Sequence, residues 1–517
     1  MASLKPTLLP RMRLGLLANF AGSGWSALMQ IVCVPFYIKF MGVESYGLIG
    51  FYLVFQAMTQ VLDLGLSPTM NREMARYSVQ PKKAAEARDL VRTLEVGYWL
   101  IGSVIAAMLA AASTWLATRW IHGASMPIQS VREAILLMGV VSFFQWPVSF
   151  YQGGLMGLHR QVSYNIARIG VVTFSTTGAV LILWLVSHTI QAFLLWQAGV
   201  SAAQVLVLAL LLRKYLPSAQ RSPRFDFSRA RGIARFAAGV GGISVLGLAL
   251  TQVDKVVVSK LFSLKVFGYY ALAWTAASGF SLISAMLFNV IFPRMSARVA
   301  EGDEIGLRQE YHLGSQLMAV LVVPLAAILA FFSFDVLHLW TRNIELASFA
   351  APILTALVIG SALNALLLLP YSLQLAFGWT RLSLTAGLIS VAVVIPVIVP
   401  VTRHFGPLGA ASVWVALNVV NMLVAVPVMH ERVLRHEAWG YFKDIGLPIV
   451  ATTVTAALAR MALSDLRSLA AAIAALSSVW ICCQVVAILV APLVRSWTLA
   501  QASSVKLLYI KRAGSLG

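Results

Sequence analysis

The chain has 517 residues, of which 59% are hydrophobic and only 11% are charged, against about 25% charged residues in an ordinary soluble protein. This composition excludes a soluble globular enzyme, a disordered chain and a fibrous repeat. The few charges are strongly biased, because 39 lysines and arginines face 19 aspartates and glutamates and leave a formal net charge of +20. In so apolar a chain this excess indicates a polytopic membrane protein with its basic residues mostly in cytoplasmic loops.

Apolar runs divide the chain into fourteen predicted transmembrane helices, since a spanning helix needs about 20 mostly apolar residues. The first run is longer than the roughly 7–15 apolar residues of a signal-peptide core, so we expect it to be retained as a span. In chain order the predicted spans cover residues 14–37, 46–66, 94–117, 134–157, 163–186, 191–212, 233–253, 267–292, 313–334, 349–377, 382–401, 408–429, 446–464 and 468–494.

Lysines and arginines near the span ends indicate the orientation, because they concentrate in cytoplasmic loops. With a cytoplasmic N-terminus, 28 of the 39 cations fall on the cytoplasmic side, 10 fall on the other side, and Arg168 lies inside the fifth span. We therefore expect a multi-pass protein of the bacterial inner membrane with both termini in the cytoplasm. The 213–235 loop also contains the polar stretch PSAQRSPRFDFSR, which indicates a boundary between two bundles.

An internal repeat supports this boundary. A shift of 222 residues superposes Arg13 on Arg235, and without a gap it places the NREMAR stretch (71–76) on PRMSAR (293–298). Six spans separate the copies, so the two halves run parallel about an axis along the membrane normal.

The predicted fold is therefore an all-α integral membrane protein with about fourteen transmembrane helices. They form two six-helix bundles with pseudo-two-fold symmetry, followed by two C-terminal helices. The predicted parts are an N-terminal bundle (1–212), a cytoplasmic linker (213–232), a C-terminal bundle (233–430), and the two additional helices with a cytoplasmic tail (431–517).

Ionisable side chains inside a span are costly in lipid, so they are candidates for a polar lumen. Arg168 lies about five residues inside the fifth span. It either faces a water-filled lumen open to an anionic substrate or reaches back to the inner headgroups. Asp63, near the inner end of the second span, is a lumen counter-charge or proton-coupling group, or else a helix-end carboxylate, which is the commoner role.

Two further pairs and a set of amides complete the candidates. Arg13 and Arg235 open the first and seventh spans, where they either bind phosphate together at the inner mouth or anchor the helix ends. Asp254 and Lys255 end the seventh span and either line the outer half of the lumen or form an interfacial ion pair. Amides inside the spans join helices or contact sugar hydroxyls across a polar lumen. These amides are Gln30, Gln56, Gln60, Gln145, Gln152, Asn289, Asn364, Gln374, Asn418 and Asn421.

From this inventory we take eight residues as candidate substrate-binding groups: Arg168, Arg13, Arg235, Asp63, Asp254, Lys255, Asn289 and Gln374. Motifs of catalysis are missing from the sequence. There is no G-x-x-x-x-G-K-[ST] phosphate loop and no H-E-x-x-H motif, so we expect neither ATP hydrolysis nor a zinc site. We expect no catalysis, no metal and no cofactor, and we name an H⁺ or Na⁺ gradient as the candidate energy source.

Residues 19–76 resemble the opening of the polysaccharide-biosynthesis flippases. These belong to the multidrug/oligosaccharidyl-lipid/polysaccharide exporter superfamily, together with multidrug and toxic-compound extruders and lipid II flippases. The resemblance rests on Pro35-Phe-Tyr-Ile38, Met41-Gly42, Tyr46-Gly47, Asp63-Leu64-Gly65 and the run from Arg72 to Arg76. Residues 252–273 are similar to the matching part of the family's second half, although Phe262-Ser263 stands where Leu-Gly is usual.

This resemblance implies alternating access by two six-helix bundles around a cationic lumen. The implied substrate is an undecaprenyl-pyrophosphate-linked oligosaccharide, moved from the cytoplasmic to the outer leaflet for surface polysaccharide biosynthesis. The expected surroundings are the lipid bilayer and a polysaccharide polymerase or export machinery, with no nucleic acid. One rival is a cation-coupled multidrug extruder of the same superfamily, which the scarcity of carboxylates in the first six spans disfavours. The other is a membrane glycosyltransferase or polymerase, which the short external loops disfavour.

Overall fold

The computed structural model describes residues 8–60, 63, 65–121, 126–219, 221–226, 245–463 and 469–499. The regular elements of these residues are helices, and eleven of them are long and apolar enough to cross a membrane. Two of the eleven, residues 18–60 and 381–432, contain a glycine at which the helix breaks, so each accommodates two crossings. Residues 245–261 form a further helix. The protein is therefore an all-helical, multi-span membrane protein.

The chain divides into two compact units, Met1–Ala271 and Leu272–Gly517. The helices of the first unit are α1 (Leu8–Gln60), α2 (Leu66–Ser78), α3 (Ala84–Trp115) with its π-helical end (Leu116–Trp120), α4 (Ile128–Gln145), α5 (Val148–Gly157), α6 (Gln161–Leu185), α7 (Ile190–Tyr215), residues 245–261 and the start of α9 (Leu264–Ala277). The first unit contains every residue that lines the polar cavity described below.

Helix breaks in the first unit follow from local sequence. α1 is interrupted at Gly42, which has φ 80° and ψ 167°, a conformation that costs glycine little because it lacks a Cβ atom. The break lies between the two predicted spans 14–37 and 46–66. The predicted fourth span is divided into α4 and α5 just before Pro147, since proline removes a backbone hydrogen bond.

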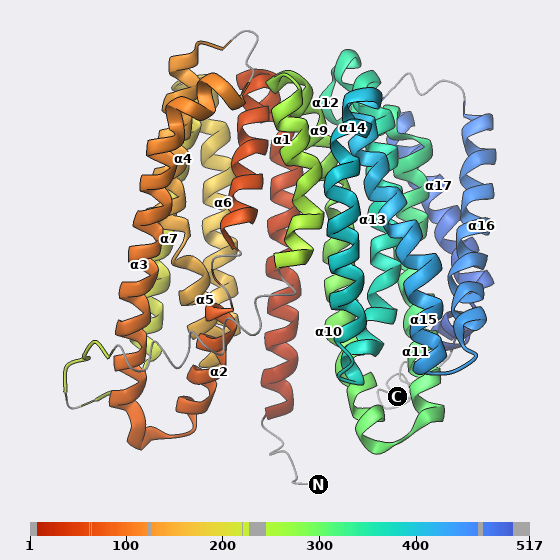
Figure 1. Ribbon diagram of the computed structural model, residues 1–517, viewed down its shortest axis with the longest axis horizontal. Coiled ribbons are helices and arrows are strands. Elements are labelled where there is room, and N and C mark those ends of the chain that lie inside the picture. Colours follow the sequence, from red (N-terminus) through yellow and green to blue (C-terminus); the bar gives the residue numbers. More distant parts are fainter. Residues whose placement is uncertain are drawn as a thin grey trace, which may run out of the picture. The chain divides into compact units, whose positions relative to one another are not determined.

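The first unit is built around helices that run alongside one another. α3 packs on α4, α4 on α7, α7 on α6, and α6 on α1 (Figure 1). The short helices α2 and α5 pack against each other, and α5 also packs on α7. A core of large side chains fills the space between α2, α3, α5 and α7, and its fully buried members include Met70, Met74, Tyr98, Phe150 and Tyr151. This core fixes the position of Tyr98, whose hydroxyl donates to Asp63 of the cavity described below.

α2 and α5 approach each other closely at two glycines spaced as in a G-x-x-x-G motif. A Cβ atom added to Gly153 would lie 2.6 Å from the carbonyl oxygen of Ser67, and one added to Gly157 would lie 2.3 Å from that of Asn71. Small residues at this spacing allow membrane helices to pack with their backbones in contact. The contact holds α2, which carries Ser67, against α5, which carries Gln152.

Replacing Gly157 with alanine is therefore expected to destabilise the first unit. The new methyl group would also lie 2.7 Å from the Cβ atom of Met74, and such overpacking costs about 1–3 kcal/mol. We expect a lower midpoint of thermal unfolding for the purified protein in detergent. The matched control is Gly170→Ala on α6, because a Cβ atom there meets nothing within 4 Å. Equal midpoints for the two variants would contradict the proposed close contact.

The second unit contains the end of α9 and the helices α10 (Gly279–Glu301), α11 (Glu304–Phe331), α12 (Ser333–Thr341), α13 (Ile344–Ala376), α14 (Arg381–Val420), a π-helical turn (Asn421–Ala425), α15 (Val426–Arg432), α16 (Ala438–Ala462) and α17 (Leu469–Val490). α11 packs on α10, α13, α16 and α17, and α13 packs on α14 (Figure 1). α14 breaks at Gly406, which has φ 68°, between the predicted spans 382–401 and 408–429.

A polar cluster fastens α16 to α11 in the second unit. The His312 ring lies between two carboxylates, with Nδ1 2.5 Å from Asp444 Oδ2 and Nε2 3.0 Å from Glu437 Oε2. Arg308 donates to Glu437 Oε1 over 2.7 Å, and Gln316 donates to Asp444 Oδ1 over 2.6 Å. Because α11 also packs within the rest of the unit, this cluster attaches the C-terminal helices to the unit.

The described helices follow the order of the predicted spans but differ from them in places, and residues 233–244 of the predicted seventh span lie outside the described residues. The predicted seventh span ends at 253, whereas the helix continues to residue 261, because the charges of Asp254 and Lys255 pair with each other instead of ending the helix. The predicted eighth span is divided into α9 and α10 at Ser278. The boundaries predicted for the four parts of the chain remain predictions.

Candidate functional site

A polar cavity of about 370 Å³ opens within the first unit. Its walls come from the end of α1, the start of α2, the middle of α3, the end of α4 and the start of α5. The residues that line it are Gln56, Thr59, Gln60, Asp63, Ser67, Ile105, Ser142, Gln145, Trp146, Val148, Ser149 and Gln152. Most of these side chains can form hydrogen bonds, which is unusual for helices of this apolarity.

Asp63 is the one charged residue among those that line the cavity. Its carboxylate accepts hydrogen bonds from the Ser67 backbone N–H over 3.1 Å and from the Ser67 hydroxyl over 2.9 Å. It also accepts a short hydrogen bond from the Tyr98 hydroxyl. Hydrogen bonds from several donors stabilise a carboxylate and hold it in one orientation. The negative charge is therefore fixed at the point where α2 begins and faces the cavity.

Glutamine side chains connect the helices around the cavity. Gln56 of α1 donates to Gln145 of α4, and Gln145 in turn donates to the Ser201 hydroxyl of α7 over 3.3 Å. Gln152 of α5 accepts from the Tyr164 hydroxyl of α6 over 2.8 Å. A primary amide has two donors and an acceptor with two lone pairs, so each amide retains capacity for a ligand.

Trp146 contributes an aromatic surface to the cavity and carries a buried donor without a partner among the described residues. Its side chain is buried, and its Nε1–H has no hydrogen-bond partner among the described residues. An unpaired buried donor is costly unless water or a ligand satisfies it. The cavity therefore combines a flat aromatic ring, amide and hydroxyl groups, and one carboxylate. This set of groups can bind a polyhydroxylated, uncharged molecule.

Arg168 lies on α6, outside the lining of this cavity. Its Nη1 donates to the Ser23 hydroxyl of α1 over 3.2 Å. The neighbouring contact between these helices is also polar, since the Asn165 amide donates to Asn19 over 2.5 Å. Arg168 therefore belongs to a polar seam between α1 and α6, defined by Asn19, Ser23, Asn165 and Arg168. A guanidinium has five donors, so the contacts made within the described part of the chain leave most of its hydrogen-bonding capacity for a further partner.

Asp254 and Lys255 form an ion pair inside the first unit. Lys255 Nζ lies 3.1 Å from Asp254 Oδ1, and both side chains are buried, at 3% and 8% exposure. The Tyr270 hydroxyl of α9 donates to Asp254 Oδ2 over 2.6 Å. A buried pair with these extra hydrogen bonds is stable where it is, but breaking it by removing one partner would be costly.

Of the other four predicted residues, Asn289 and Gln374 do not line the polar cavity of the first unit. Asn289 is exposed on α10, and Gln374 is buried on α13, where it accepts from the Ser383 hydroxyl over 2.7 Å. Arg13 lies in α1, and its side chain is outside the described part of the chain. Arg235 lies wholly outside the described residues. Of the six candidates whose side chains are described, Asp63 alone lines this cavity, and the roles predicted for all eight remain predictions.

Sequence reasoning noted the amides of the cavity but missed Ser67, Tyr98, Ser142 and Ser149. A signal for part of this set was present, because Gln56, Thr59 and Gln60 are spaced three and four residues apart. That spacing places them on one face of a helix. Gln145, Ser149 and Gln152 follow the same spacing across the break at Pro147. Tyr98 carries no such signal, since it is one aromatic residue in an apolar helix.

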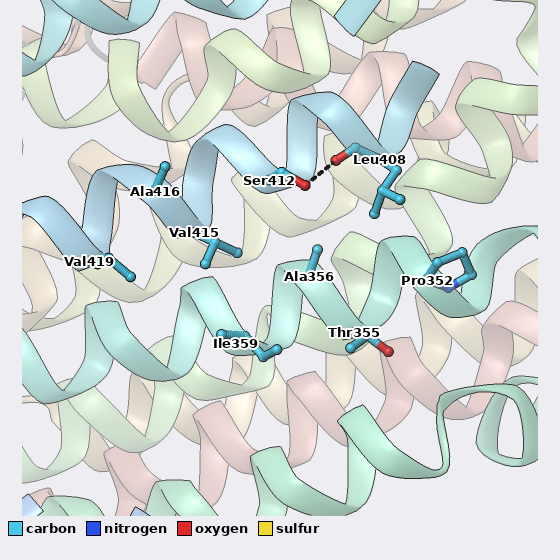
Figure 2. Close-up of a pocket in the computed structure, with 9 residues that line it drawn as sticks. All are labelled: Pro352, Thr355, Ala356, Ile359, Leu408, Ser412, Val415, Ala416 and Val419. Carbon is cyan, nitrogen blue, oxygen red and sulfur yellow. Dashed lines mark hydrogen bonds between the residues drawn. The ribbon is translucent and has the colours of Figure 1, made fainter. Parts of the chain in front are cut away.

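A second cavity, of about 620 Å³, lies between α13 and α14 in the second unit. Figure 2 shows its residues along two facing helices, with the Ser412 hydroxyl turned toward the backbone of its own helix. The lining is almost entirely apolar and consists of Pro352, Thr355, Ala356, Ile359, Leu408, Ser412, Val415, Ala416 and Val419. It lacks the groups that would bind a polar headgroup, so it is not the candidate site.

Comparisons with known proteins agree on the fold. The chain is similar to the lipid II flippase MurJ in its inward closed conformation, with a TM-score of 0.64 and 13% identity over 95% of this chain and 99% of that one. It is also similar to an inward-facing multidrug-resistance transporter of the MATE family, with a TM-score of 0.61 and 13% identity over 86% and 96% of the two chains. The predicted MATE-like helical architecture is thus confirmed.

Sequence comparisons identify relatives of the chain. It is 20% identical over 410 residues to a Shigella flexneri protein described as an O-antigen transporter, and the match covers 78% of this chain and 94% of that protein. The family described as "Polysaccharide biosynthesis protein" matches residues 14–298, which is more than half of the chain. The chain therefore belongs to the polysaccharide biosynthesis protein family.

Proposed function

We propose that the protein moves an undecaprenyl-pyrophosphate-linked oligosaccharide across the bacterial inner membrane, for surface polysaccharide biosynthesis, by alternating access. Membership in the polysaccharide biosynthesis family supports this proposal. So do a relative described as an O-antigen transporter and the structural similarity to a lipid II flippase. In this proposal the chain is a transporter and performs no catalysis, and both termini lie in the cytoplasm.

The polar cavity of the first unit is the observation that carries the proposal. A glycan presents many hydroxyl groups, each of which is both a donor and an acceptor, and the cavity offers amides and hydroxyls that match both roles. Its volume of about 370 Å³ lies within the usual range for pockets that bind small molecules. Such a cavity inside an apolar bundle provides a polar passage for the headgroup, while lipid surrounds the apolar tail.

The charge of the cavity disfavours the multidrug extruder. A cationic drug needs negative charge in its site, but Asp63 is the single carboxylate among the lining residues, and the other polar groups of the lining are uncharged. Nothing in the described residues favours a glycosyltransferase or polymerase. The coupling ion, H⁺ or Na⁺, remains part of the proposal and rests on the superfamily alone.

Deleting the protein in its host tests this function. We expect surface polysaccharide to be lost and the complete lipid-linked oligosaccharide to accumulate on the cytoplasmic face, because its synthesis precedes transport. Extraction and mass spectrometry of the lipid-linked glycans measure the accumulation, and expression of the intact chain should reverse it. Normal surface polysaccharide combined with increased sensitivity to cationic dyes would instead support the extruder.

A further inference from the structure

A separate, cationic cavity lies where α3 begins and α7 ends. These two helix ends lie at the same end of the first unit (Figure 1). Its volume is about 390 Å³. Three arginines line it, Arg88 and Arg92 from α3 and Arg213 from α7, together with Glu95. Pro223, from the segment that follows α7, contributes a further wall. The proposed transport has no role for this cavity.

The charges of this cavity do not cancel. Glu95 is 7% exposed, and it accepts from Arg213 Nη2 over 3.0 Å and from the Tyr151 hydroxyl over 2.6 Å. Arg92 Nη1 lies 3.5 Å from its other oxygen. Arg88 uses its Nε to donate to the Pro217 carbonyl oxygen over 2.9 Å. One carboxylate therefore faces three guanidiniums, and the side chains of Arg92 and Arg213 remain 53% and 61% exposed.

The nearby carboxylate of Asp89 does not neutralise the remaining charge, because the segment after α7 engages it. Arg221 Nη1 donates to Asp89 Oδ1 over 3.1 Å, and the Arg224 backbone N–H donates to the same oxygen over 2.7 Å. The Asp226 backbone N–H donates to the Thr93 hydroxyl over 2.9 Å. These contacts hold the segment against α3, so the wall formed by Pro223 is fixed in place.

The length of α3 places the cavity at the membrane interface. The helix has 32 residues, or about 48 Å at 1.5 Å per residue, whereas the hydrocarbon core is about 30 Å thick. The twenty residues 96–115 carry no charge and are long enough to cross that core. Arg88, Arg92 and Glu95 precede this stretch, so they lie at the level of the lipid headgroups.

We propose that this cavity binds a phosphate group at the membrane interface. Planar guanidiniums bind phosphate oxygens bidentately, and basic pockets between transmembrane helices are suited to anionic lipid headgroups. The group can come from the headgroup of an anionic phospholipid or from a soluble phosphate. Both sources offer the same chemistry to the three arginines, and the experiment below distinguishes them.

Binding to the purified full-length protein tests the proposal without any measurement of transport. Native mass spectrometry in neutral detergent would compare adducts of phosphatidylglycerol with those of phosphatidylcholine. We expect the Arg88→Gln/Arg92→Gln double variant to bind phosphatidylglycerol about ten-fold more weakly, which corresponds to about 1.4 kcal/mol. Arg213 is kept because it makes the shorter ion pair with Glu95, 3.0 Å against 3.5 Å for Arg92. Arg92→Lys retains the positive charge but loses the planar pair of donors. Its affinity for phosphatidylglycerol should lie between those of the intact protein and the double variant.

Arg76→Gln is the matched control, since Arg76 is an exposed cation on neighbouring α2 and lies outside the cavity. A second titration adds inorganic pyrophosphate to the purified protein and measures the midpoint of thermal unfolding. It tests whether the cavity binds a soluble phosphate. Loss of lipid binding in the double variant supports a lipid headgroup as the ligand. Loss of pyrophosphate stabilisation alone supports a soluble phosphate. If the double variant and Arg76→Gln bind both ligands equally well, the cavity is no phosphate site, and the proposed transport is unaffected.

Discussion

Replacing Asp63 with asparagine is expected to reduce export of the lipid-linked glycan by about ten-fold or more, while the protein still inserts into the membrane. Asp63 carries the only charge among the residues that line the polar cavity. Hydrogen bonds to a charged group contribute about 1.5–3 kcal/mol each, which corresponds to roughly ten-fold to a hundred-fold in binding. Asparagine has nearly the same shape, so the cavity should retain its volume.

Export in the deletion strain complemented with each variant measures this effect, with protein level determined in parallel. Glu133→Gln is the matched control, because Glu133 lies on α4 outside the cavity, where it accepts from Gln129 over 3.0 Å. Tyr98→Phe should give a smaller loss, since it removes one of three donors to Asp63 and keeps the charge. Full export by Asp63→Asn at a normal protein level would remove the carboxylate from the site.

Replacing Arg168 with alanine is expected to abolish export, whereas Arg168→Lys should retain part of it. Among the described residues, the guanidinium makes one hydrogen bond, of 3.2 Å to Ser23, so its other donors can bind the phosphate oxygens of the substrate. Lysine keeps the positive charge but offers a single point of contact. The measurement is again export against protein level in the complemented deletion strain.

Ser23→Ala separates the two interpretations of Arg168. If the arginine binds substrate, loss of its one hydrogen bond to α1 should weaken export only slightly. If the arginine serves to hold α1 and α6 together, Ser23→Ala and Arg168→Ala should lower the midpoint of thermal unfolding alike. Normal export by Arg168→Ala would show that this side chain has no role in transport.

The helices could be predicted from the sequence because lipid imposes a simple rule on each of them. A chain in hydrocarbon must satisfy its backbone hydrogen bonds within each helix. Each long apolar run therefore predicts a spanning helix. The helix breaks at Gly42 and Gly406 lie between predicted spans, because the apolar runs that predict the spans end there. The division of the predicted eighth span at Ser278 could not be predicted, since the apolar pattern continues through it.

The site could be predicted only in part, because its contacts join residues far apart in the chain. Tyr98 and Asp63 are 35 positions apart, Gln56 and Gln145 are 89 apart, and neither helix pairing follows from hydropathy. The sequence singled out Asp63 because a carboxylate inside a span is rare. It missed Tyr98 because a tyrosine in an apolar helix is common, and only packing turns its hydroxyl toward Asp63.

The distribution of charge explains why the net charge of +20 did not identify the site. Most of the cations lie near the ends of the predicted spans, where they set orientation. The polar cavity itself contains none, and the concentration of arginines around Arg88, Arg92 and Arg213 lies at the other candidate site. The excess of positive charge therefore indicates topology and contact with anionic lipid, whereas the proposed glycan contacts are made mainly by uncharged groups.

Translocation by the purified protein in liposomes tests the central claim most directly. A lipid-linked oligosaccharide would be placed in both leaflets, and an enzyme that cannot cross the bilayer would modify the glycan from outside. We predict that vesicles with the intact protein expose nearly all of the glycan over time, that protein-free vesicles expose only the outer-leaflet share, and that Asp63→Asn vesicles are slow. Exposure no greater than in protein-free vesicles, from protein shown to be folded, would contradict the proposed flippase.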